Sequence, residues 1–336
     1  EIDFDGVIEA QYGQVPPDRP QPDLNKVREA AQRISEARRP VIVAGAGVKY
    51  SGAYEALNHL AEAMHVPVAT SLNAKDAILD NNPLSVGVVG TYSRRSANQV
   101  VAEADLVIFV GTRAGGMTTH FWTIPAKGTS TIQIDIDPLV NGRNYPTDVS
   151  IVGDARVTLE KMNELNIPVP KERVEWLKQV KAICTSYKID FKEVYESDAY
   201  PIRPERIVNE LSNGMPKNAV IVVDTGHSGM WMGGMFEKRH EGQSYIRSAG
   251  HLGWAFPAAL GAKCGAPHRP VVCFMGDLGF WYHMAEVETA VRAGINTITI
   301  INNNNSGNMA KGSISAIYDD QPTKESQDIW VQNKIN

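Results

Sequence analysis

Short apolar runs alternate with amphipathic stretches over the first half of the chain. Helix-spaced apolar residues occur at 24–34, and Pro40 then introduces an apolar run at 41–44 that ends in the turn Gly45-Ala46-Gly47. A second helical pattern covers 53–64, and further apolar runs follow at 66–69, 106–110 and 131–136. Continuous apolar strands separated by helices are typical of a parallel sheet covered on both faces.

A second alternation begins after residue 200. Its apolar runs lie at 219–223, 270–275 and 297–301, and its helical patterns lie at 204–212, 254–264 and 284–292. Charged sequence flanked by prolines at 166–200 predicts a connection that carries a helix. We therefore expect an α/β protein with two doubly wound parallel-sheet domains, arranged as a linker (1–22), a central α/β domain (23–165), the connection (166–200) and a second domain (201–336).

Length and charge narrow the functional classes. At about 150 residues per domain, 336 residues suffice for two domains that each bury a core. Lys and Arg number 33 against 38 Asp and Glu, and without a basic block the chain is not expected to bind nucleic acid. No apolar run approaches the roughly 20 residues that cross a bilayer, so no membrane association is expected.

The cysteines and the N-terminal segment bear on the cellular compartment of the chain and on whether it is part of a longer polypeptide. Cys184, Cys264 and Cys273 show no C-x-x-C spacing, which argues against a disulfide framework or a structural zinc site and favours a cytoplasmic location. The first residues lack a signal-peptide pattern. The Pro-rich stretch at 12–23 is typical of a linker entering a domain, so we expect the chain to be part of a longer polypeptide.

Two polar loops follow neighbouring strands of the second domain. The run at 270–275 leads into Gly276-Asp277, and the run at 297–301 leads into Asn303, Asn304 and Ser306. Open α/β sheets bind ligands at the carboxyl ends of their strands. A carboxylate, an amide oxygen and a backbone carbonyl are the hard-oxygen ligands that Mg²⁺ prefers. The two loops therefore predict a site for a Mg²⁺-bridged diphosphate, which glycines allow the backbone to approach.

These loops resemble a known cofactor fingerprint. The pairs Gly276-Asp277 and Asn303-Asn304, with 27 residues from Asp277 to Asn304, are similar to the thiamine diphosphate fingerprint, in which G-D-G is followed by N-N. The segments at 224–227 and 250–259 resemble that family's diphosphate loop and the segment beneath its thiazolium ring. With three matches in order, the chain is identified as a member of the acetolactate synthase-like group of thiamine diphosphate-dependent enzymes.

The resemblance implies roles for individual residues. Asp277, the side chain of Asn304 and the backbone carbonyl of Ser306 are the implied Mg²⁺ ligands. Leu252 takes the position of the apolar residue that holds the cofactor bent, and Gly250 would offer its carbonyl to the 4′-amino group. The implied cofactor-binding residues are Gly226, His227, Gly250, Leu252, Gly276, Leu278, Gly279, Asn304, Gly307 and Met309.

Leu278 departs from the fingerprint, which usually has a second glycine at this position. Phosphate is contacted by backbone N–H groups rather than by the missing side chain. We therefore expect binding to survive where the φ of Leu278 is negative, and to be damaged where a positive φ is required.

The first domain resembles the family's central domain, which holds FAD or ADP in some members and nothing in others. The resemblance rests on the segments at 40–47, 110–113 and 134–138. The turn at 45–47 lacks the full G-x-G-x-x-G spacing and its distal acidic residue, and the family's flavin-associated run is replaced at 113–120. We therefore favour the interpretation that these glycines only allow the chain to turn, rather than the interpretation that they contact a bound FAD or ADP. Arg113 fits either a phosphate contact or a solvated loop.

No catalytic residue is assigned. The family's catalytic glutamate lies on a separate pyrimidine-binding domain, which no segment of this chain resembles, and the second domain is expected to be incomplete at Asn336. His251 and His227 are candidate substrate-side groups because they lie inside cofactor motifs, whereas His283 fits a structural role better.

The resemblance implies a thiamine diphosphate- and Mg²⁺-dependent lyase or transferase. Its substrates would be small 2-oxo acids or 2-hydroxyacyl compounds, which it would decarboxylate and join by carboligation. The family's active site lies between subunits, so a homodimer or homotetramer is expected. The alternative is a non-catalytic nucleotide-binding or regulatory relative that lacks the glutamate-bearing domain.

Overall fold

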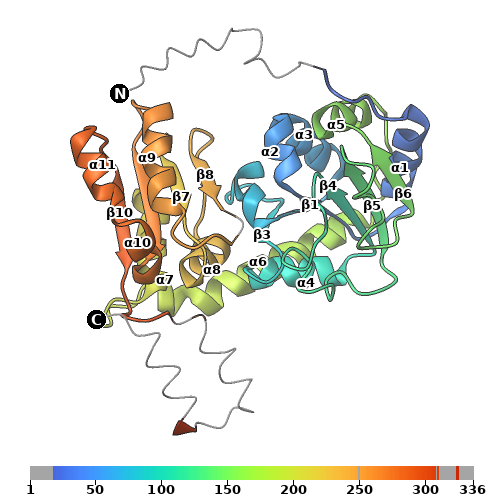
Figure 1. Ribbon diagram of the computed structural model, residues 1–336. Coiled ribbons are helices and arrows are strands. Elements are labelled where there is room, and N and C mark those ends of the chain that lie inside the picture. Colours follow the sequence, from blue (N-terminus) through green and yellow to red (C-terminus); the bar gives the residue numbers. More distant parts are fainter. Residues whose placement is uncertain (1–17, 249, 308, 310–322, 325–336) are drawn as a thin grey trace, which may run out of the picture.

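The computed structural model describes residues 18–248, 250–307, 309, 323 and 324. These residues form two parallel sheets flanked by helices, which confirms the predicted α/β class (Figure 1). The first sheet contains strands β1 to β6 and the second contains β7 to β10. No helix in the described part of the chain is long and apolar enough to span a membrane.

The first sheet has the strand order β3-β2-β1-β4-β5-β6, and all neighbours are parallel. Every residue of β1 and β4 is buried, because helices cover both faces of the sheet at its centre. The elements are α1 (Leu24–Glu36), β1 (Pro40–Ala44), α2 (Ala46–Ser51), α3 (Tyr54–Met64), β2 (Val68–Thr70), the 3₁₀ helix η2 (Leu72–Ala77), β3 (Ser85–Val88), α4 (Arg95–Glu103), β4 (Leu106–Val110), β5 (Ser130–Asp135), β6 (Val149–Val152) and α5 (Ala155–Asn163).

The second sheet has the order β10-β9-β7-β8 and is also parallel. Its buried strands β7 and β9 lie between α8 on one face and α9 on the other. The elements are α6 (Arg173–Tyr195), α7 (Pro204–Gly214), β7 (Val220–Val223), α8 (His227–Met235), β8 (Ser244–Arg247), α9 (Ala255–Gly265), β9 (Val271–Gly276), α10 (Asp277–His283), α11 (Glu286–Arg292) and β10 (Ile298–Asn302).

The predicted strands agree with the structure wherever the apolar run is continuous. Each predicted run corresponds to one strand, namely β1, β2, β4, β5, β7, β9 or β10. The strands β3, β6 and β8 were not predicted, and β6 shows why, because its residues alternate between buried and exposed. The helices α2, α4, α5, α8 and α10 were not predicted either.

Helix α6 joins the two domains (Figure 1). Its first residue, Arg173, is fully buried, and its guanidinium donates hydrogen bonds to the carbonyls of Ile34, Ala37 and Met64, where α1 and α3 end. Carbonyls at the end of a helix have no partner within that helix and carry partial negative charge. The buried cation therefore anchors α6 to the first domain.

A buried ionic network fixes the second domain against the first. Asp80 forms ion pairs with Arg94 Nη2 at 3.0 Å and with Lys75 Nζ at 3.4 Å. It also accepts a hydrogen bond from the backbone N–H of Lys238 at 2.8 Å. Burial opposes ionisation of Asp80, but the two cations and the backbone hydrogen bond hold its pKa below the ordinary value. Arg94 Nε also donates to the carbonyl of Gly234 at 2.9 Å. Lys238 and Gly234 belong to the second domain, so the network spans the interface.

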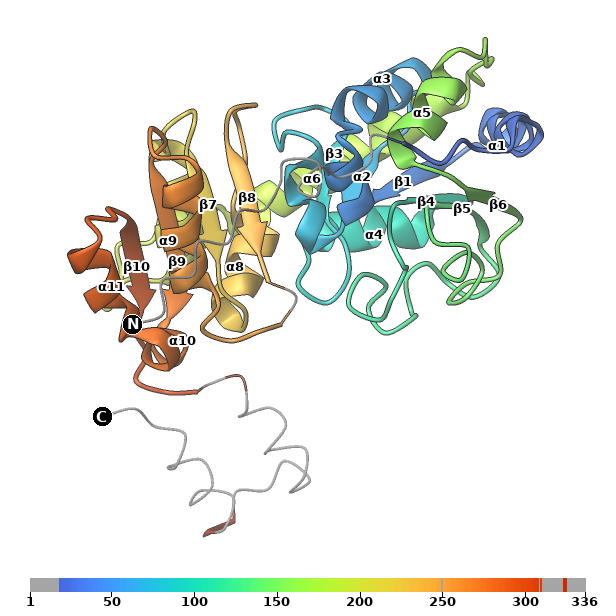
Figure 2. The ribbon, with the colours of Figure 1, turned by 45° about the horizontal axis from the view of Figure 1, so that its top comes forward.

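The edge strand β8 is covered by the first domain, where it lies against η2 (Figure 2). The carboxylate of Asp76 accepts a hydrogen bond from the backbone N–H of Tyr245 at 3.2 Å and forms an ion pair with Lys49 at 2.9 Å. Lys49 also donates to the carbonyl of Tyr245. Backbone groups at a free sheet edge need partners, and here the first domain supplies them.

Candidate functional site

A cavity of about 350 Å³ lies at the carboxyl ends of β7, β9 and β10. These strands are parallel neighbours, so the loops that follow them meet at one edge of the sheet. Eleven of the thirteen predicted site residues line the cavity: Gly226, His227, Leu252, Gly276, Asp277, Leu278, Gly279, Asn304, Ser306, Gly307 and Met309.

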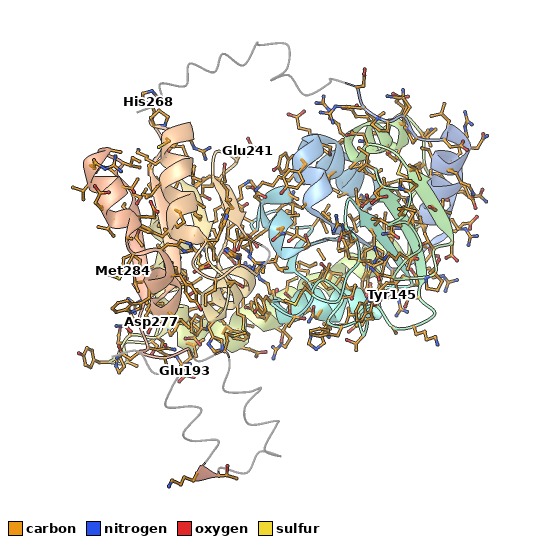
Figure 3. All side chains as sticks on the ribbon, in the orientation of Figure 1. Tyr145, Glu193, Glu241, His268, Asp277 and Met284 are labelled. Atoms are coloured by element: carbon orange, nitrogen blue, oxygen red, sulfur yellow. The ribbon has the colours of Figure 1, made fainter. Side chains whose placement is uncertain are left out.

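Asp277 lies where β9 ends and α10 begins (Figure 3). Its side chain is buried, and its Oδ1 accepts a hydrogen bond from the backbone N–H of Leu278 at 2.8 Å. Its Oδ2 accepts from the backbone N–H of Ser306 at 3.2 Å. This second bond ties the loop after β9 to the loop after β10.

Two of the three predicted metal ligands, the side chains of Asp277 and Asn304, meet at the backbone N–H of Ser306. The side-chain oxygen of Asn304 accepts a hydrogen bond from the same Ser306 N–H, also at 3.2 Å. A carboxylate oxygen and an amide oxygen thus lie beside one backbone N–H, and oxygens of these two kinds are ligands that Mg²⁺ prefers. Among the described residues, no three His, Cys, Asp or Glu side chains are grouped to hold a metal. The mixed set at Asp277, Asn304 and Ser306 is therefore the candidate metal centre.

Gly226 begins the loop-to-helix turn on the other side of the cavity. It caps α8 with a φ of 75°, a conformation that glycine adopts without steric cost. The first N–H groups of a helix have no partner within it, and a first turn that lines a cavity can therefore bind phosphate. His227 starts α8, with its ring 5.5 Å from that of Trp231. Partial burial lowers the pKa of His227 and favours the neutral imidazole.

Leu278 lies inside α10 and is absent from the described residues with positive φ. Leu278 therefore meets the condition of a negative φ, under which we expect a leucine in place of the usual glycine to leave phosphate binding intact. Gly279 has a stricter requirement, because a Cβ at this position would lie 2.3 Å from Oδ2 of Asp224. The glycine that packing demands is thus Gly279 rather than its neighbour.

Asp224 holds three loops together. It begins the segment that resembles the diphosphate loop, but no role of its own was predicted for it. It is fully buried at the end of β7, and it accepts hydrogen bonds from the N–H groups of Thr225 at 2.9 Å and Gly253 at 3.0 Å. Gly279 lies against its carboxylate. Burial raises the pKa of Asp224, although the two backbone hydrogen bonds oppose that shift. An acidic residue directly after a buried strand was the available signal.

Substitution of Gly279 by alanine is expected to lower the free energy of unfolding by about 1–3 kcal/mol, because the new methyl group overpacks the buried Asp224 carboxylate. The matched control is Gly261→Ala in the interior of α9, where a Cβ would meet no atom within 4 Å. That control is expected to be neutral or stabilising. Urea unfolding followed by circular dichroism measures both, and equal stability of the two variants would contradict the packing argument.

Two family models match the chain. One is the central domain of thiamine pyrophosphate enzymes, matched over residues 27–162, and the other is their C-terminal thiamine pyrophosphate-binding domain, matched over 224–336. The chain belongs to the thiamine pyrophosphate enzyme family. This finding confirms the family that the sequence motifs resemble, and it places the cavity at the end of β9 within the matched binding domain.

Curated relatives of this thiamine pyrophosphate family member are acetolactate synthase large subunits. A probable one from Methanococcus aeolicus is 35% identical over 296 residues, which are 83% of this chain and 49% of the relative. One from Methanocaldococcus jannaschii is 34% identical, covering 83% of the chain and 48% of the relative, and one from Lactococcus lactis is 27% identical, covering 90% and 52%. The chain spans about half the length of the curated relatives that it matches.

Two predicted residues lie apart from the main cavity of this family member. Gly250, with a φ of 102°, lines a neighbouring cavity, and the side chain of His251 is exposed. Leu252, between them and Gly253, lines the main cavity as predicted. Tyr92 of the first domain also lines the main cavity, and nothing in the motifs pointed to it.

The glycines after β1 are explained by packing within the central domain. A Cβ at Gly45 would lie 2.2 Å from the carbonyl oxygen of Gly111, and a Cβ at Gly47 would lie 2.6 Å from the Cα of Gly111. The turns that follow β1 and β4 therefore approach each other closely, which accounts for these glycines without a nucleotide. Arg113, the other candidate in this region, is exposed.

Proposed function

We propose that the protein is a thiamine diphosphate- and Mg²⁺-dependent lyase or transferase that breaks and forms C–C bonds in 2-oxo acids or 2-hydroxyacyl compounds. The supporting observation is the meeting of Asp277 and Asn304 at the Ser306 N–H, beside a cavity at the ends of three parallel strands. The match to the thiamine pyrophosphate-binding domain supports the cofactor.

The proposal assigns a task to each part of the cavity wall. Asp277, Asn304 and the carbonyl of Ser306 would hold Mg²⁺, which offsets the charge of a diphosphate. Gly226 and the first turn of α8 would donate N–H groups to the phosphate oxygens. Leu252 would provide an apolar support for the ring system. When bound, thiamine diphosphate supplies the carbon nucleophile and stores the carbanion after a bond to carbon breaks.

Substrates and assembly are proposed from the relatives. Several similar proteins are acetolactate synthase large subunits, so 2-oxo acid decarboxylation followed by carboligation is the favoured reaction. A homodimer or homotetramer, with a catalytic glutamate from a separate pyrimidine-binding domain, completes the proposal. The relatives' length is consistent with a further segment, because this chain spans about half of it.

Calorimetric titration of the full-length protein with thiamine diphosphate, with and without Mg²⁺, tests the proposed function. Binding that depends on Mg²⁺ is expected, because the metal must offset the diphosphate charge. The same titration of the 336-residue chain tests whether these residues alone bind the diphosphate group of the cofactor. Absence of binding in folded full-length protein would overturn the proposal and favour the non-catalytic regulatory alternative.

A further inference from the structure

A second cavity, of about 380 Å³, lies between the two domains beside the candidate cofactor site. Tyr92 and Thr225 line both cavities, so the two adjoin each other. The first domain contributes neutral side chains, among them Asn73 and Thr118, and the second domain contributes Arg247. Arg247 is the single charged residue among the described residues that line this cavity.

Arg247 is the last residue of β8, and its guanidinium is without partners in the described part of the chain. The side chain is half-buried, its Nε is buried without a hydrogen-bond acceptor, and no carboxylate of the described residues forms an ion pair with it. The nearby carboxylate of Asp224 is occupied by the N–H groups of Thr225 and Gly253. Burial lowers the pKa of Arg247, but an arginine keeps its charge at neutral pH.

Two buried arginines show how this chain satisfies a guanidinium. Arg94 forms an ion pair with Asp80 and donates to the carbonyl of Gly234. Arg173 donates to three backbone carbonyls. A buried guanidinium N–H that lacks such a partner is costly. The unpartnered Nε–H of the Arg247 guanidinium, on the wall of a cavity, thus indicates a place for an anion that arrives with a ligand.

We propose that Arg247 and the cavity around it bind the carboxylate of a small-molecule substrate. A guanidinium can hold a carboxylate through two parallel N–H···O bonds, which fixes both position and orientation. The cavity is small, it adjoins the candidate cofactor site through Tyr92 and Thr225, and Gly250, a predicted cofactor-binding residue, lies on its wall. In a 2-oxo acid the carboxylate is one bond from the reacting carbonyl, so neighbouring sites for the two groups match this substrate class. This inference rests on the proposed function and names the substrate-recognition residue.

The test is calorimetric titration of the full-length protein, saturated with thiamine diphosphate and Mg²⁺, with oxamate, an unreactive analogue of a 2-oxo acid. Arg247→Met is expected to weaken oxamate binding by about 10- to 100-fold, because it removes the charged hydrogen-bond donors while keeping an apolar stem. Arg247→Lys is expected to retain part of the affinity, since it keeps the charge without the planar fork. Oxamide, the neutral analogue of oxamate, is expected to bind all three proteins equally weakly.

Thiamine diphosphate affinity, measured on the same variants, separates the two proposals. The matched control is Arg292→Met, which removes an exposed arginine of the same domain that lies on α11. Unchanged oxamate affinity in Arg247→Met, with normal cofactor binding, would overturn the carboxylate site and leave the proposed function intact. An equal loss of cofactor affinity in Arg247→Met would also overturn it, because Arg247 would then serve the diphosphate. Failure of the unsubstituted protein to bind the cofactor would instead reject the proposed function.

Discussion

Replacing Asp277 with alanine is expected to weaken Mg²⁺-dependent binding of thiamine diphosphate by about 100-fold or more. Loss of a residue that merely orients a metal ligand costs about 10- to 100-fold in metal affinity, so loss of a direct charged ligand should cost at least as much. Asp277 is the one carboxylate in the candidate metal centre, and the remaining donors there are a neutral amide and a backbone carbonyl. They cannot offset the charge of a divalent cation.

Titration calorimetry with and without Mg²⁺ measures the effect of Asp277→Ala. Asp277→Asn keeps the shape and one oxygen but removes the charge, and it should give an intermediate loss. The matched control is Asp137→Ala, which removes a carboxylate that likewise accepts a local backbone N–H, at 2.9 Å from Leu139, in a distant loop of the first domain. All variants should give the circular dichroism spectrum of the unsubstituted protein. Cofactor affinity that Asp277→Ala leaves unchanged would refute the metal assignment.

The parts of the fold that were predicted from sequence are those where one local pattern decides the outcome. The strands β4 and β9 are buried on both faces, so their apolar runs are continuous and are bounded by polar turns. The short strand β8 has only one fully buried residue, Tyr245, and its pairing is decided by β7 and by the first domain. A four-residue segment of this kind carries no periodic signal strong enough to be recognised alone.

The same distinction holds for the candidate site. Asp277 and Asn304 were found because a fixed spacing connects two loops that the sheet must bring together. Asp224, Tyr92 and Arg247 were missed because their importance depends on packing between loops or between domains. A carboxylate that accepts an N–H from a loop 29 residues away and an arginine whose buried Nε lacks a partner become visible only once the chain is folded.

Replacing Asp80 with alanine is expected to lower the free energy of unfolding by about 3–5 kcal/mol, the cost of removing one partner from a buried ion pair. Lys75 and Arg94 are both buried, and both would lose their shared counterion. The backbone N–H of Lys238 in the second domain would also lose its acceptor. Burial already lowers the pKa of Lys75 to about 8 despite the presence of Asp80, so the variant should shed this proton more readily still.

Urea unfolding at several pH values measures the loss and identifies its cause. The folded pKa of Asp80 is below its ordinary value of 3.8, so its stabilisation is complete well above that pH and is lost as the pH falls through the folded pKa. The difference in free energy of unfolding between the unsubstituted protein and Asp80→Ala should therefore become smaller at acidic pH. The control is Glu288→Ala, which removes an exposed ion pair with Arg292 and should cost about 0.5 kcal/mol or less. Adding Lys75→Met to Asp80→Ala should recover part of the stability, because it removes one of the two stranded cations. A loss in Asp80→Ala no larger than that in Glu288→Ala would show that the network does not hold the two domains together.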